Sequence, residues 1–291
     1  MSGRKVPVKN GYAYDFDLDV SGNAVRRNSH SQKPTGVRII KSLRQLKTLL
    51  ITLLFLCLIT PCRAEMPKGF VDVKDVIPSI VLDIRYYSSH NFVGRPIAGY
   101  SAPKCLLTRN AALALKKVQA ELLRFSLSLK IYDGYRPQQA VNHFIRWAKD
   151  ANDIKMKKEF YPTIYKSELF QKGYIAKKSA HSRGSAVDLT LVPLPLKLQE
   201  PYVKGMELCE CHKPVEKRFK DNSIDMGTGF DCFHPLSWTA SDRIGRPQRQ
   251  NRFMLKAVME KYGFRNYIKE WWHYTFRNEP FPETYFDFTI K

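Results

Sequence analysis

The apolar run Thr48–Thr60 divides this 291-residue chain into two unlike parts and limits what the first part can form. A helix that crosses a bilayer needs about 20 apolar residues, so this run is too short for a comfortable anchor. With basic residues between positions 41 and 47, it has the pattern of a signal peptide. Ala64 supplies the small residue expected before a cleavage site, so we expect processing between Ala64 and Glu65, and secretion. A retained signal anchor is the alternative.

The chain therefore has three expected regions. Residues 1–47 are polar and basic, and we expect a disordered extension. Residues 48–64 form the apolar and cleavage regions of the signal peptide. Residues 65–291 hold the folded domain, because 44% hydrophobic and 12% aromatic residues suffice for a core. The net charge of +21 is spread without a long basic run, and no nucleic-acid-binding motif accompanies it. We therefore expect no nucleic-acid partner, and no stable membrane span after processing.

Hydrophobic periodicity after residue 65 predicts helices and strands without a regular βαβ rhythm, which favours an α+β fold. Apolar spacing at Leu113, Val118, Leu122 and Phe125 indicates an amphipathic helix. Residues 71–84 predict short strands and turns. The clearest elements are helices over 108–125, 138–151 and 248–262, the last stopped by a glycine, and strands over 127–132, 186–192 and 267–276.

Four cysteines lie in the expected mature part, namely Cys105, Cys209, Cys211 and Cys232. An oxidising compartment allows disulfides, and four cysteines allow three pairings. The cluster Cys209-Glu-Cys211-His212 can also suggest a metal site, but it lacks a matching second pair of ligands. We therefore favour a disulfide or free thiols there over a structural zinc.

A histidine and an aspartate, His181 and Asp188, flank a glycine turn and lead into the predicted strand over 186–192. Imidazole nitrogen and carboxylate oxygen are both normal zinc ligands. By itself such a pair is more often a hydrogen-bonded structural pair than a metal site.

The segment Glu270-Trp-Trp-His273 offers a third ligand and a spare carboxylate. Three protein ligands and one water describe a catalytic zinc site, and a nearby carboxylate can take the proton of that water. Residues three apart on a regular strand point to opposite faces. Glu270 and His273 can therefore converge only if Glu270 lies at a bend or at the start of a strand. A buried Glu–His pair in an aromatic core strand is the alternative.

Arg136 lies in Asp133-Gly-Tyr-Arg-Pro137, after the predicted strand over 127–132. A fixed guanidinium can stabilise the negative charge that develops on a carbonyl oxygen during peptide hydrolysis. The alternative for one such residue is an ordinary surface arginine.

Taken together, these motifs resemble the D-alanyl-D-alanine dipeptidases, zinc peptidases that share their fold with the hedgehog signalling domain. The resemblance runs from about Val71 to Lys291. It implies an α+β fold of the hedgehog/DD-peptidase type, with a central, mainly antiparallel sheet flanked by helices. The matching segments are Asn91–Pro96, Asp133–Pro137, Ser182–Thr190, Met226–Asp231, Glu270–Tyr274 and Tyr285–Phe288.

The resemblance also implies an activity and the residues that perform it. One Zn²⁺ per chain would hydrolyse D-alanyl-D-alanine, in periplasmic turnover of cell-wall dipeptide. Its implied ligands are His181, Asp188 and His273, with Glu270 as general base and Arg136 stabilising the tetrahedral intermediate. Asp231 and Tyr86 would meet the substrate's ammonium group, and Ser179 and Tyr100 would lie near its carboxylate.

Two alternative functions stay open at this point. A DD- or LD-carboxypeptidase acting on peptidoglycan stem peptides would need a site open beyond the ammonium pocket. A zinc-containing binding module without catalysis would not need Glu270 or Arg136. Residues of about Glu200–Ser223 form an insertion relative to compact members of the family. We expect either a surface loop or a lid that changes substrate choice.

Overall fold

The computed structural model describes residues 17–18, 24–25 and 66–291, in two compact units, Met1–Arg63 and Ala64–Lys291. In the first unit, β1 (Asp17–Leu18) pairs antiparallel with β2 (Ala24–Val25). Apart from these four residues, the first 65 residues lie outside the described ranges. The expected disordered extension, signal peptide and cleavage site fall in that part of the chain. Among the described helices, none combines the length and hydropathy that crossing a bilayer requires.

The second unit is built on a five-stranded sheet. In spatial order its strands are β4 (Val81–Leu82), β6 (Leu127–Asp133), β7 (Ala186–Pro193), β9 (His273–Phe276) and β8 (Phe264–Asn266). Strand β4 runs parallel to β6, and the other neighbours are antiparallel. A separate antiparallel pair joins β3 (Phe70–Asp72) to β5 (Leu106–Thr108). This arrangement confirms the α+β class and the mainly antiparallel sheet.

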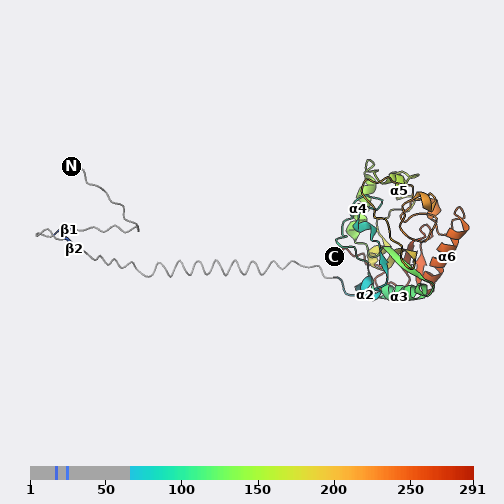
Figure 1. The fold of residues 1–291 in the computed structure, drawn as a ribbon, viewed down its shortest axis with the longest axis horizontal. Coiled ribbons are helices and arrows are strands. Elements are labelled where there is room, and N and C mark those ends of the chain that lie inside the picture. The colour runs from blue at the N-terminus through green and yellow to red at the C-terminus, as the bar shows by residue number, and fades with distance from the viewer. Residues whose placement is uncertain (1–16, 19–23, 26–65) are drawn as a thin grey trace. The chain divides into compact units, whose positions relative to one another are not determined.

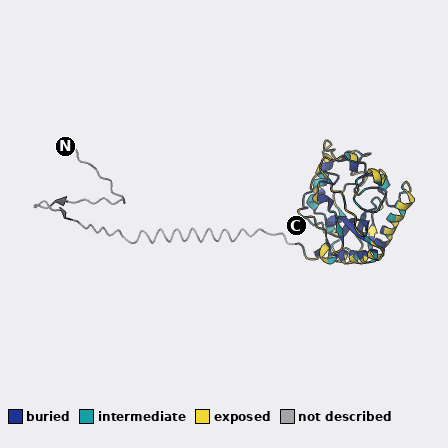
Figure 2. Cartoon of the chain, in the orientation of Figure 1, coloured by how far each residue is buried: buried dark blue, intermediate teal, exposed yellow. Residues whose placement is uncertain are grey.

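Three long helices enclose the sheet, at the positions that periodicity predicts. Figure 1 shows them around the strands, and Figure 2 shows that the strands are the more buried part. They are α3 (Arg109–Leu123), α4 (Gln138–Lys149) and α6 (Arg246–Lys261). The short helices are α2 (Val73–Val76), α5 (Lys157–Phe160) and the 3-10 turns η1 (Arg85–Tyr87), η2 (Lys166–Glu168), η3 (Ala180–Arg183), η4 (Val215–Lys217) and η5 (Pro235–Ser237).

The buried face of α3 differs in part from the predicted one. Val118 and Leu122 are buried, but Leu113 is 42% exposed and Phe125 is 68% exposed. Residues 111, 115, 118 and 122 follow the helical period, whereas position 113 lies off that face and Phe125 lies two residues beyond the end of the helix. Apolar character alone therefore misplaced two of the four residues.

The predicted single strand over 267–276 is wrong, because β8 and β9 are two strands joined by a turn. The N–H of Tyr267 donates to the carbonyl of His273 over 3.0 Å, and that of Glu270 donates to the carbonyl of Tyr267 over 3.0 Å. Since β8 and β9 pair with each other, the residues between them must reverse direction. Trp271 and Trp272, just before β9, are buried in the core.

Of the four cysteines after residue 65, Cys211 and Cys232 form a disulfide, while Cys105 and Cys209 are free. The preference for a disulfide or free thiols over a zinc site around Cys209 is therefore confirmed. Within the described residues, the candidate metal group lies elsewhere.

Candidate metal centre and substrate pocket

Strand pairing brings two of the predicted ligands together. Asp188 on β7 is the direct antiparallel partner of His273 at the start of β9. The Nδ1 atom of His273 lies 3.0 Å from Oδ1 of Asp188. Their 85-residue separation in sequence is thus bridged by the register of the sheet.

The third predicted ligand, His181, is positioned by a short 3-10 turn just before β7. Ser179 caps the turn, since its Oγ accepts the N–H of His181 over 3.3 Å. Gly184 ends it with φ of +76°, a conformation that favours glycine. A Cβ there would also lie 2.2 Å from the Phe70 ring, so two constraints select glycine.

The donor atoms of His181, Asp188 and His273 converge on one point. Nε2 of His181 lies 3.0 Å from Nδ1 of His273 and 3.3 Å from Oδ1 of Asp188. Tetrahedral coordination with Zn–N and Zn–O bonds of ordinary length places ligand atoms about 3.3 Å apart. These distances therefore fit a metal ion bound by three protein ligands.

The protonation of this group also suits a metal. Nδ1 of His181 lies 2.7 Å from the carbonyl oxygen of Gly134, which can only accept, so Nδ1 carries a proton and Nε2 is the atom that faces the other two ligands. Burial by itself would raise the pKa of Asp188, but His181 and His273 hold it far below its usual range. Asp188 is therefore ionised.

Glu270 lies in the turn before β9, where the objection based on strand geometry does not apply. Its Oε2 is 3.9 Å from Nδ1 of His273, and its side chain lines the same pocket as the three candidate ligands. Burial, and then the charge of Asp188, raises the pKa of Glu270 to about 8. A bound dication would oppose this shift by favouring the carboxylate.

Arg136 is held at the opposite side of Asp188. Its Nε donates to Oδ2 of Asp133 over 2.9 Å, and its Nη2 lies 3.3 Å from Oδ2 of Asp188. The guanidinium also packs over the rings of Tyr86 and Phe144, at 5.0 and 5.3 Å. It is therefore a fixed group at the pocket, not a surface arginine.

Asp133 is the residue that sequence reasoning missed, although it begins the Asp133–Pro137 motif. It is fully buried, binds Arg136, and lies 3.5 Å from Nδ1 of His181. Its position at the buried end of a predicted strand, three residues before the arginine, was the available signal. Asp133 therefore contacts both Arg136 and the candidate ligand His181.

A pocket of about 280 Å³ opens over these residues. Tyr86 and Asp231 line it and bind each other, since the Tyr86 hydroxyl donates to Oδ2 of Asp231 over 2.8 Å. Burial, and then the charge of Asp188, raises the pKa of Asp231 well above its usual value. A cation would compensate this buried carboxylate.

The two residues expected near a substrate carboxylate are placed differently. Ser179 lines the pocket, whereas Tyr100 is not among the lining residues. The hydroxyl of Tyr100 donates to Oδ1 of Asp133 over 2.6 Å, behind Arg136. The pocket is also lined by Tyr174, Lys178 and Phe233, which the sequence did not single out.

The fold and the site together define a metallopeptidase: three convergent ligand atoms, a carboxylate and a fixed guanidinium share one pocket. The family model described as D-ala-D-ala dipeptidase, peptidase M15, matches residues 66–200 and 199–291. The chain belongs to this family, which confirms the resemblance given by its motifs.

Individual relatives agree over nearly the whole described domain. D-alanyl-D-alanine dipeptidase of Enterococcus faecalis is 35% identical over 226 residues, covering 78% of this chain and 100% of the relative. The Streptomyces coelicolor dipeptidase is 36% identical over 225 residues, covering 77% and 100%. The Escherichia coli dipeptidase is 28% identical over 204 residues, covering 70% and 82%.

Proposed function

We propose that this protein hydrolyses the dipeptide D-alanyl-D-alanine to two D-alanines, with one zinc ion held by His181, Asp188 and His273. One observation carries the proposal: three donor atoms converge in a pocket that is also lined by the buried, hydrogen-bonded Tyr86–Asp231 pair. A free dipeptide has an ammonium group close to its only peptide bond. The peptide bond would lie at the metal ligands while the ammonium group meets Asp231. The names of the relatives support the same substrate.

The proposed chemistry divides among the side chains. When bound, zinc supplies a Lewis acid and lowers the pKa of a coordinated water. Glu270 takes the proton from the attacking water and returns it to the leaving amine nitrogen. Arg136 stabilises the negative charge on the carbonyl oxygen, and Asp133 keeps the guanidinium in place. Asp231 pairs with the substrate ammonium, while Ser179 faces the carboxylate end.

Hydrolysis of D-alanyl-D-alanine by wild type and by Glu270→Ala, at equal zinc content, tests the reaction and its base. We expect the variant to lose roughly a hundred- to ten-thousandfold in kcat. Equal rates would remove Glu270 from the proposed role. A chelator should abolish the wild-type activity, and added zinc should restore it.

An N-acetylated dipeptide separates this function from that of a stem-peptide carboxypeptidase. We expect rapid cleavage of the free dipeptide and poor cleavage of the acetylated one, because acetylation removes the cation that Asp231 would pair with. Comparable rates on both would favour the carboxypeptidase.

We also propose that the enzyme is exported and acts on dipeptide released in the periplasm during cell-wall turnover. This rests on the apolar run Thr48–Thr60 and on Ala64. The N-terminal residue of the exported protein tests the idea, and we expect Glu65. An intact chain in the membrane fraction would instead favour a retained signal anchor.

A further inference from the structure

The disulfide Cys211–Cys232 ends next to the residue proposed to recognise the ammonium group. Cys232 directly follows Asp231, and Cys211 comes from the 200–223 segment. Asp231 has φ of +54°, in the left-handed region that non-glycine residues rarely adopt. Such a conformation persists only where the surrounding structure holds it.

Cys211 attaches to the chain on both sides of Asp231. Its carbonyl oxygen accepts the N–H of Gly229 over 2.8 Å, and its sulfur is bonded to Cys232. Its own N–H donates to the carbonyl of Glu159, at α5, over 3.0 Å. Cys211 therefore holds the chain on both sides of Asp231, and its own N–H connects this part of the chain to α5.

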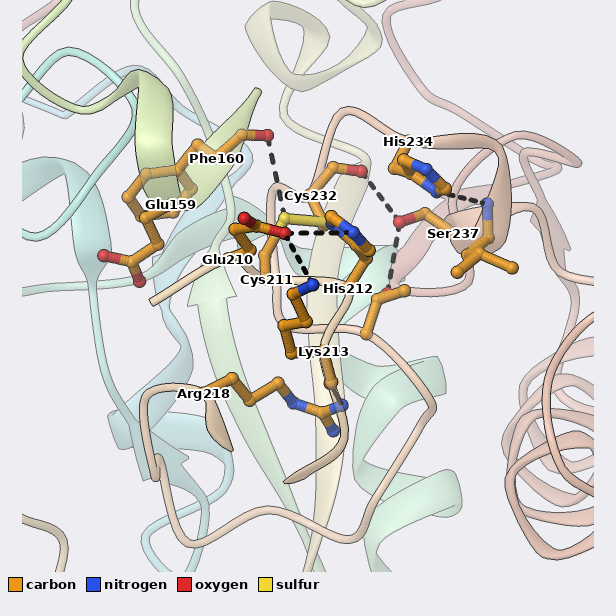
Figure 3. Close-up of a disulfide and its surroundings, with 12 residues drawn as sticks. Glu159, Phe160, Glu210, Cys211, His212, Lys213, Arg218, Cys232, His234 and Ser237 are labelled. Carbon is orange, nitrogen blue, oxygen red and sulfur yellow. Dashed lines mark hydrogen bonds and ion pairs between the residues drawn. A yellow bond between two sulfur atoms is a disulfide. The ribbon is translucent and has the colours of Figure 1, made fainter. Parts of the chain in front are cut away.

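The chain that follows Asp231 is fixed as well, and Figure 3 shows part of these contacts. The carbonyl oxygen of Cys232 accepts the hydroxyl of Ser237 over 2.7 Å, and Phe233 donates its N–H to the carbonyl of Phe160 over 2.8 Å. Both half-cystines are buried, at 4% and 0% exposure. The disulfide is thus part of the wall behind the pocket.

The segment that supplies Cys211 is itself anchored to the domain. Asp221 binds the hydroxyl of Tyr132 and pairs with Arg85 and Lys130. The ring of Tyr202 stacks on His90, with centroids 4.3 Å apart. These contacts give Cys211 a fixed base.

We propose that the Cys211–Cys232 disulfide is a positioning element for substrate recognition: it holds Asp231 in its left-handed conformation, with the carboxylate facing the ammonium group. The inference rests on the proposed dipeptidase function. Cys211 and Cys232 act through Asp231 and do not touch the substrate. The 200–223 segment therefore sets affinity for the free amino end of the substrate.

The test is the double variant Cys211→Ala/Cys232→Ala, with Cys209→Ala as matched control, since Cys209 is a free thiol two residues from Cys211. With D-alanyl-D-alanine and matched zinc content, we expect KM to rise roughly tenfold and kcat to change by less than about threefold. The control should behave like wild type. An unchanged KM in the double variant overturns the proposal.

A double-mutant cycle that combines Asp231→Asn with loss of the disulfide tests whether the disulfide positions Asp231 or only stabilises the fold. If the disulfide acts through Asp231, this substitution raises KM much less in the disulfide-free background than in wild type. Fully additive effects overturn the proposal. If the double alanine variant does not fold, Cys211→Ala/Cys232→Val, which restores buried volume, takes its place. A wild type inactive on every D,D-dipeptide defeats the proposed function itself, and this inference with it.

Discussion

The two sides of the pocket are built by different means. On the metal side, Asp188 and His273 are paired residues on adjacent strands, and His181 lies in a short turn leading into the same strand β7. On the recognition side, Asp231 lies in an irregular segment and Tyr86 lies in the 3-10 turn η1, 145 residues away in sequence. Strand register positions Asp188 and His273, and a capped 3-10 turn positions His181, whereas the recognition side depends on side-chain contacts and one disulfide.

The difference has a physical consequence. A ladder of backbone hydrogen bonds fixes Asp188 and His273 largely independently of their neighbours' side chains. Asp231 has no such ladder and has a positive φ, so the groups packed around it determine where its carboxylate lies. Changes on the metal side should therefore abolish the reaction, and changes on the recognition side should mainly weaken substrate binding.

The largest expected effect tests the metal side. His273→Ala removes one of three ligand atoms, so we expect bound zinc to fall from one per chain to nearly none and kcat/KM to fall by about a thousandfold or more. Metal analysis and dipeptide hydrolysis measure this. His212→Ala is the matched control, because His212 stacks on His234 outside the pocket. Full zinc retention in His273→Ala would remove His273 from the ligand set.

Next in size is the removal of charge on the recognition side. Asp231→Asn keeps the shape of the side chain but not its negative charge, so we expect KM to rise about ten- to hundredfold with little change in kcat. Steady-state kinetics on free and N-acetylated dipeptides measure this, and the preference for the free form should shrink. Asp242→Asn, at an exposed position, is the control. A fall in kcat alone would place Asp231 with the catalytic groups instead.

A smaller effect concerns stability in the metal-free protein. The pKa of Glu270 rises from 4.5 to about 8 on folding, chiefly through burial and then through the charge of Asp188. The folded state thus binds this proton more tightly than the unfolded state, and the resulting stability is lost as pH rises through 8. We expect metal-free Glu270→Gln to gain roughly 3 to 5 kcal/mol relative to wild type between about pH 5 and pH 9.

Urea unfolding in the presence of a chelator measures this difference at each pH. Repeating it with zinc is the control, because a bound dication favours the Glu270 carboxylate and should diminish the gain. Parallel stability curves for the two metal-free proteins would show that Glu270 is not the titrating group.

The smallest expected effect tests whether the hydroxyl of Tyr100 contacts Asp133 or the substrate carboxylate. Because its hydroxyl binds Asp133 behind Arg136, Tyr100→Phe should lower kcat about two- to tenfold and leave KM nearly unchanged. Steady-state kinetics measure both constants. The control is Tyr87→Phe, at a partly exposed tyrosine. A large rise in KM would support the contact with the substrate carboxylate that the family resemblance implies.

Local signals in the sequence sufficed for the longest helices and strands of the described fold. Sequence patterns predicted helices at α3, α4 and α6, and β-branched and alternating runs predicted β6 and β7. Both strands are buried at nearly every residue, although the alternation in β6 alone would suggest one buried face. The motifs also predicted the group His181, Asp188 and His273, and the structure brings these side chains together.

Only the tertiary structure decided the rest. The turn between β8 and β9 depends on their pairing, which the aromatic composition of residues 267–276 does not encode. The role of Asp133 and the place of Tyr100 follow from contacts across the core. The partner of Cys211 was one of several that sequence allowed, because spacing along a chain does not specify which distant segments pack together. Sequence therefore determined the chemistry available to this protein, and packing determined how its recognition side is held.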